Sequence, residues 1–158
     1  MKTIAKKAET YIRIIFILLF VLYLSYLFYL TFFSHLYGRG YFHRSINLVP
    51  LATIRLFFAS GYLRGILVNV FGNIAAFVPM GLLLPAAFIR AARLYRTLLV
   101  TLGISLMIEI VQYAFGVGAA DVDDLMLNLA GGLLGYAVFT AGRALYRHII
   151  MPCNTTAD

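Results

Sequence analysis

Residues 14–33 read IIFILLFVLYLSYLFYLTFF, twenty residues without a charged side chain. A helix of about 20 apolar residues is long enough to cross the hydrocarbon core of a bilayer, so this stretch predicts a transmembrane helix. Lys2, Lys6 and Lys7 precede it, as in a secretory signal peptide. The apolar run is too long for a signal peptide, however, and no Ala-x-Ala cleavage site follows it. We therefore expect an uncleaved membrane anchor.

Three further apolar runs follow, at residues 66–89, 97–118 and 125–142. The run at 97–118 contains one ionisable residue, Glu109, and the last run is shorter and rich in Gly and Ala. Of the 158 residues, 63% are hydrophobic and only 12% are charged, about half the usual charged share of a soluble domain. Lipid tails solvate such side chains where water does not. The predicted fold is all-α, a polytopic transmembrane bundle of four spans that forms one domain over residues 1–158.

The positive charges predict how the four spans are oriented. The net charge of +7 comes from Lys and Arg residues that stand singly between apolar runs, which argues against nucleic acid as a partner. Nine of them flank the expected cytoplasmic ends of the spans: Lys2, Lys6, Lys7, Arg13, Arg90, Arg93, Arg96, Arg143 and Arg147. Because cytoplasmic loops carry the excess of Lys and Arg, we expect both termini in the cytoplasm, in a multi-pass membrane protein.

The connection between the first two spans, residues 34–65, then lies outside the cell. It is not plainly soluble, since it contains Leu48, Val49, Leu56, Phe57 and Phe58. We expect this partly apolar outer loop to lie on the membrane surface or to dip back into the bundle.

Two pairs of polar residues interrupt the apolar runs. Asn69 and Asn73 are four residues apart, and Glu109 and Gln112 are three apart, so each pair shares one face of its helix. A charged side chain at the centre of a membrane helix costs about 2.5–3.5 kcal/mol by insertion scales, so an intramembrane Glu indicates a functional site by default. The alternative is structural, because such side chains also hydrogen-bond between helices.

A third polar set opens the fourth span. Asp121, Asp124, Asn128, Gly131 and Gly135 follow at spacings of three, four, three and four, which places them on one stripe of one helix. Acidic residues at a helix N-terminus also have a simpler explanation, namely capping and the helix dipole. In the expected orientation all three polar sets fall in the outer half of the bilayer. We infer a polar cleft that opens toward the extracytoplasmic side.

The remaining chemistry-bearing residues give weaker indications. Asp123 falls off the stripe and is interpreted as a solvated or capping acid. Cys153 is the only cysteine, so an intrachain disulfide is excluded, and the sequence has no His-rich or Cys cluster. We expect neither a metal nor another cofactor.

Three blocks of sequence carry a resemblance to a known family. They are RSINLVP at residues 44–50, NVFGNIAAFVPMG at residues 69–81, and EIVQ at residues 109–112 followed by GAADVDDLMLNLAGGLLG at residues 118–135. Together and in this order they resemble the VanZ-like family. The resemblance implies a multi-pass protein of a bacterial plasma membrane. It also implies low-level resistance to the glycopeptide teicoplanin without a change of the cell-wall precursor. It also adds Arg44, Asn47 and Pro50 as candidate positions, but it implies no catalytic residue, because the family's molecular activity is not established.

The chain departs from the family pattern at one position. Many relatives carry an Arg three residues before the first Asp of the loop, where this chain has Gly118. Asp121 therefore lacks a basic partner nearby in sequence. Arg44 of the outer loop is our candidate for its replacement.

Three functions remain open from the sequence. The first is a non-enzymatic protein that acts in the outer leaflet, in contact with membrane lipid and with a lipoglycopeptide or a lipid-linked cell-wall precursor. The second is an intramembrane enzyme for a lipid-linked substrate, with Glu109, Asp121 and Asp124 as acid, base or magnesium ligands. The third is a small transporter or channel component. It would need a homo-oligomer, which Gly131 and Gly135 would permit.

Overall fold

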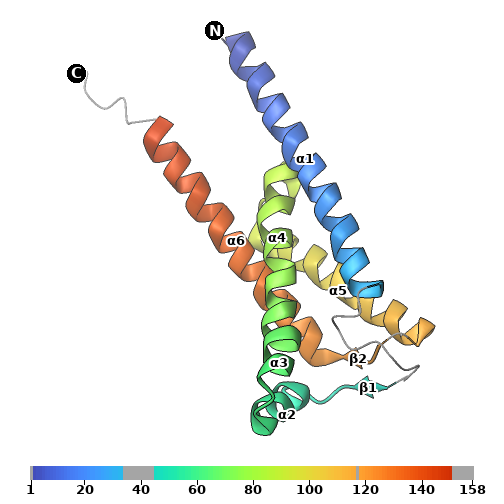
Figure 1. Ribbon diagram of the computed structural model, residues 1–158. Helices are drawn as coiled ribbons and strands as arrows, with labels where there is room; N and C mark the ends of the chain where they lie inside the picture. The colour runs from blue at the N-terminus through green and yellow to red at the C-terminus, as the bar shows by residue number, and fades with distance from the viewer. Residues whose placement is uncertain (1, 34–44, 117, 151–158) are drawn as a thin grey trace.

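A computed structural model describes residues 2–33, 45–116 and 118–150. Four long helical segments follow one another: α1 (Lys2–Phe32), then α3 (Leu63–Gly65), η2 (Ile66–Phe71) and α4 (Gly72–Ala87) as one rod, then α5 (Leu94–Phe115) and α6 (Val122–Ile150) (Figure 1). Between them lie β1 (Ile46–Asn47), α2 (Ala52–Ser60), η3 (Ile89–Ala91) and β2 (Ala120–Asp121).

The four long segments confirm the predicted all-α, four-span fold. Each is long and apolar enough to cross a membrane, with spans at Glu9–Phe32, Leu63–Ala87, Leu94–Phe115 and Val122–Ile149. The last helix is longer than predicted, because it continues beyond residue 142 through Arg143 and Arg147. Long basic side chains can keep an apolar stem in the membrane and a charged head in water, so they need not end the helix.

The backbones of α4 and α6 lie in direct contact. A Cβ atom added to Gly135 would lie 2.0 Å from the carbonyl oxygen of Val78, and one added to Gly81 would lie 1.9 Å from the carbonyl oxygen of Gly132. Only glycine permits such an approach. The stripe that includes Gly131 and Gly135 is thus used within the chain, between α6 and α4.

The buried core is small, as expected for helices that are solvated by lipid. It forms where α1, α4 and α5 meet, and its largest members are Phe20, Leu27, Phe77, Met80, Leu84 and Ile108. Much of the remaining apolar surface faces outward, with Leu22 66% and Phe115 70% exposed in the isolated chain. In a bilayer these side chains contact lipid tails.

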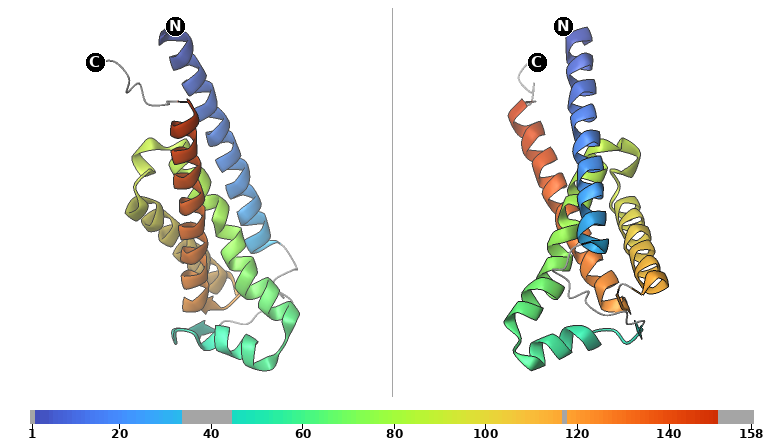
Figure 2. Two further views of the ribbon diagram at one scale, coloured as in Figure 1. Left: turned by 90° about the vertical axis from the view of Figure 1, so that its left-hand side faces the viewer. Right: turned by 45° about the vertical axis from the view of Figure 1, so that its right-hand side comes forward.

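The predicted outer loop is partly a helix. Strands β1 and β2 pair in parallel, with Ile46 opposite Ala120 and Asn47 opposite Asp121. Helix α2 then lies across one end of the bundle, and none of its residues is buried (Figure 2). Its exposed face includes Leu56, 67% exposed. The exposed residues of α2 combine such apolar side chains with Arg55, and a position on the membrane surface stays a prediction.

Candidate functional site

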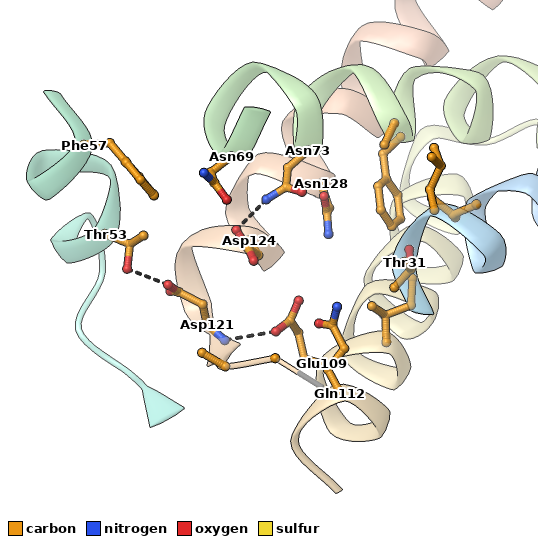
Figure 3. Close-up of a pocket in the computed structure, with 17 residues that line it drawn as sticks. Thr31, Thr53, Phe57, Asn69, Asn73, Glu109, Gln112, Asp121, Asp124 and Asn128 are labelled. Atoms are coloured by element: carbon orange, nitrogen blue, oxygen red, sulfur yellow. Dashed lines mark hydrogen bonds between the residues drawn. The ribbon is translucent and has the colours of Figure 1, made fainter. Parts of the chain in front are cut away.

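A cavity of about 250 Å³ lies between the helices at the end of the bundle that α2 covers (Figure 3). The structure brings all seven predicted cleft residues to its wall: Asn69, Asn73, Glu109, Gln112, Asp121, Asp124 and Asn128. They come from η2, α4, α5, β2 and α6, and the spacing argument had placed each set on one face of its helix. Their function stays a prediction, but their convergence on one cavity is an observation.

Asn69 and Asn73 reach the cavity from a helix whose winding changes between them. Asn69 lies in η2, a π-helix, and its side-chain amide donates to the carbonyl oxygen of Gly65 at 3.0 Å. Asn73 lies one residue into α4 and donates to the Asp124 carboxylate across the cavity wall. π-helical turns are rare and occur frequently at functional sites.

Glu109 and Gln112 form the wall contributed by α5. Both are buried, 4% and 8% exposed. The Oε2 atom of Glu109 accepts the backbone N–H of Asp121 at 3.0 Å. One carboxylate oxygen is thus used to hold the loop before α6 against α5.

The side chain of Asp121 accepts three hydrogen bonds. Its Oδ1 atom accepts from the amide of Asn47 and from the backbone N–H of Asp123, each at 2.9 Å, and its Oδ2 atom accepts from the Thr53 hydroxyl. The bond to Asp123 N–H is that of an N-cap residue at the start of α6. The bond to Asp123 N–H supports the capping explanation for Asp121. The bonds from Asn47 and Thr53 also connect the outer loop to the bundle.

Asn128 has an unsatisfied acceptor next to the cavity. Its side chain is 4% exposed, and its Nδ2 atom donates to the hydroxyl of Ser105 at 2.8 Å. Within the described part of the chain, its Oδ1 atom has no hydrogen-bond partner. A buried acceptor without a partner costs about 1–3 kcal/mol, so this atom is suited to receive a donor from a bound molecule or from water.

The environment of Asp123 differs in part from the one that the sequence indicated. Asp123 was interpreted as a solvated or capping acid. The solvated interpretation is wrong, because Asp123 is fully buried, with 0% exposure. Its two carboxylate oxygens accept the backbone N–H groups of Leu51 and Ile54, at the first turn of α2. Asp123 therefore caps a different helix, and burial was not foreseen because the sequence does not reveal that α2 folds over this point.

The outer-loop motif has a structural role where the structure describes it. Asn47 donates to Asp121 and to Thr53, at 2.9 and 3.0 Å, but it does not line the cavity. Pro50 is exposed in the turn before α2 and does not line it either. Arg44, together with its expected pairing to Asp121, lies outside the described residues. Gly118 lines the cavity beside Gln112, where a Cβ would make an ordinary contact at 3.4 Å.

Several lining residues were missed by the sequence analysis. Thr53 and Phe57 of α2 are four residues apart and share one helix face, a spacing that could have identified them. The wall from α1 lies in a run without charged residues that carries no comparable signal; it consists of Leu27, Leu30 and Thr31.

The cavity wall combines two kinds of surface. It holds three carboxylates and four carboxamides, which bind hydroxyl, amide and amine groups through hydrogen bonds, and it also holds apolar side chains of α1, α4 and α5. Among the described residues, no group of three or more His, Cys, Asp and Glu side chains is arranged to hold a metal ion. The cavity therefore presents polar and apolar surface side by side.

Comparison with known proteins identifies a family to which the chain is similar. The family model described as VanZ/LLP1 matches residues 20–145. The protein named Protein VanZ, from Enterococcus faecium, is 36% identical over 99 residues, which are 63% of this chain and 55% of that protein. The similar region thus spans a little over half the length of that relative. No solved structure is significantly similar to the chain.

Proposed function

The chain belongs to the VanZ/LLP1 family and is a multi-pass protein of the plasma membrane, and from this premise we propose that it confers low-level resistance to the glycopeptide teicoplanin. In this proposal it acts without catalysis, by binding a lipoglycopeptide or a lipid-linked cell-wall precursor in the cavity. The observation that carries the proposal is the convergence of seven polar side chains from three membrane helices and the adjoining loop on one cavity of about 250 Å³.

The position of the cavity supports an action in the outer leaflet. The proposed orientation has both termini in the cytoplasm, in agreement with the Lys and Arg distribution. The cavity then lies near the outer end of the bundle, beneath α2. Phe58 and Leu56 on the exposed face of α2 would rest among the outer headgroups. A ligand with an acyl chain in that leaflet would reach the polar wall from the side.

Two substitutions test the cavity. Glu109→Gln and Asp124→Asn each replace a carboxyl group of its wall by an amide and keep the shape of the side chain. In a susceptible host that expresses equal membrane amounts of each protein, both variants should lose most of the protection against teicoplanin. Asp158→Asn, the same change outside the described residues, is the matched control and should protect fully. Full protection by both cavity variants would refute the proposal.

Vancomycin separates this action from a general change of the envelope. The proposed function requires a shift of the teicoplanin susceptibility with little change for vancomycin. Equal shifts for the two antibiotics would indicate a general envelope effect instead.

An intramembrane enzyme for a lipid-linked substrate is the second candidate. Glu109 and Asp124 both line the cavity, so two carboxylates are available there as acid and base. Turnover of a polyprenyl lipid by the purified protein, with activity lost in Asp124→Asn, would rank this candidate first.

A further inference from the structure

A second hollow lies at the opposite end of the bundle, between the first part of α1 and the last part of α6. There α1 and α6 diverge beyond the end of α4, as Figure 1 shows, and the groove between them has a volume of about 770 Å³. Its walls are mostly apolar and include Ile12, Phe16, Leu82, Val138 and Phe139. Water would be a poor occupant for such walls inside a membrane, whereas an acyl chain fits them.

Charged side chains from two helices line the same groove. Arg13 of α1 and Arg143 of α6 both contribute to it, and among the described residues its lining has one acidic member, Glu9. The Nε atom of Arg13 donates to the carbonyl oxygen of Ala87 at 3.2 Å, at the C-terminal end of α4, where the helix dipole favours a cation. Among the described residues, the Nη atoms of Arg13 and the whole guanidinium of Arg143 have no protein acceptor.

We propose that this groove binds an anionic phospholipid, with the phosphate held by Arg13 and Arg143 and an acyl chain along the apolar wall. Guanidinium groups bind phosphate oxygens through paired, charge-assisted N–H bonds. Basic pockets between membrane helices on the cytoplasmic side are known to bind anionic headgroups, and the proposed orientation puts this groove on that side. A lipid with a cationic choline is disfavoured, because the two arginines repel it.

Native mass spectrometry of the full chain in detergent tests the proposal. The protein is offered equal amounts of phosphatidylglycerol and phosphatidylcholine with identical acyl chains, and the ratio of the two bound lipids is measured. Wild type should retain phosphatidylglycerol in preference. Arg13→Gln and Arg143→Gln should each lower that preference about fivefold, as expected for one basic side chain near an anionic surface.

A charge-matched control separates the groove from the overall charge. The double variant Arg55→Gln/Arg64→Gln removes the same charge from exposed positions at the other end of the molecule. It should keep the wild-type preference. An equal loss in this control, or an unchanged preference in Arg13→Gln/Arg143→Gln, would overturn the proposal.

A second variant tests the groove without changing its charge. Gly142 lines the groove, and a Cβ atom added there meets no atom within 4 Å. Gly142→Leu, whose Cβ meets open space, should occupy part of the groove and reduce the amount of bound phosphatidylglycerol severalfold. Gly103→Leu on α5, where a Cβ also meets nothing within 4 Å, is the matched control and should bind lipid like wild type. Unchanged binding in Gly142→Leu would show that the lipid lies elsewhere.

Discussion

The carboxylate of Asp123 accepts a hydrogen bond from the backbone N–H of Leu51, a residue 72 positions earlier in the chain. Leu51 has a positive φ of 66°, which is uncommon for a residue other than glycine. The same carboxylate accepts the N–H of Ile54 at 3.1 Å. One buried side chain at the start of α6 therefore fixes both the turn before α2 and the first turn of α2 itself.

Asp123→Ala is expected to release α2 from the bundle. It leaves two backbone N–H groups without their acceptor, at a cost of about 1–3 kcal/mol for each that stays buried. Trypsin should then cleave after Arg55, within α2, several times faster than in wild type. Ser60→Ala, which removes the exposed hydrogen bond from Ser60 to Phe57 on the same helix, should leave the cleavage rate unchanged. An unchanged rate in Asp123→Ala would mean that α2 is held by other contacts.

Gly135→Ala is expected to disrupt the contact between α4 and α6. Its new Cβ would lie 2.0 Å from a backbone oxygen, which cannot move independently of its helix, so the two helices must separate. Overpacking of this kind typically costs about 1–3 kcal/mol. The thermal unfolding temperature in detergent should fall by several degrees. Gly103→Ala has open space and should raise it slightly, since Ala favours helix over Gly by up to about 1 kcal/mol. Equal unfolding temperatures for both would contradict this packing.

The sequence predicts well which residues share one face of a helix, and it predicts poorly which helices and loops contact one another. Charge and spacing placed Asn73, Glu109 and Asp124 on faces of three helices at one end of the bundle, and the structure brings these faces together around one cavity. The spacing of residues along one helix is a local property, so it predicts a shared face without knowledge of the tertiary structure. The burial of Asp123 depends instead on α2 folding back over it, and the α1 wall at Leu27 depends on how α1 packs on α4. Such long-range relationships leave no periodic signal in a single chain.

The orientation of the chain can be tested through its single cysteine. If both termini are cytoplasmic, a membrane-impermeant maleimide should label Cys153 only after the cells are opened. In a Cys153→Ser background, Ser60→Cys at the exposed end of α2 should be labelled in intact cells. The reverse pattern would place the cavity toward the cytoplasm and remove the basis for an action in the outer leaflet.

The double variant Asn128→Leu/Ser105→Ala distinguishes a binding role from a structural one. The Asn128 amide donates to Ser105, but the Asn128 Oδ1 atom has no partner in the described part of the chain. The pair therefore lowers the stability of the protein when no ligand is bound. Replacing both members of a buried polar pair by apolar groups of similar shape is often neutral or stabilising. The unfolding temperature should therefore stay unchanged or rise, by about 2–4 °C for each kcal/mol gained. Protection against teicoplanin should be lost at the same time.

Opposite changes of stability and protection are the signature of a residue kept for binding. Thr101→Val is the control. Thr101 is fully buried on the face of α5 that carries Ser105, but it does not line the cavity. Its hydroxyl donates to the carbonyl oxygen of Thr97 within the helix. Thr101→Val should change protection little. If the double variant instead unfolds several degrees earlier and still protects, Asn128 and Ser105 hold the helices together, and the unsatisfied oxygen does not mark a ligand. The proposed binding role of the cavity would then depend on Glu109 and Asp124 alone. Their substitutions test protection independently of Asn128 and Ser105.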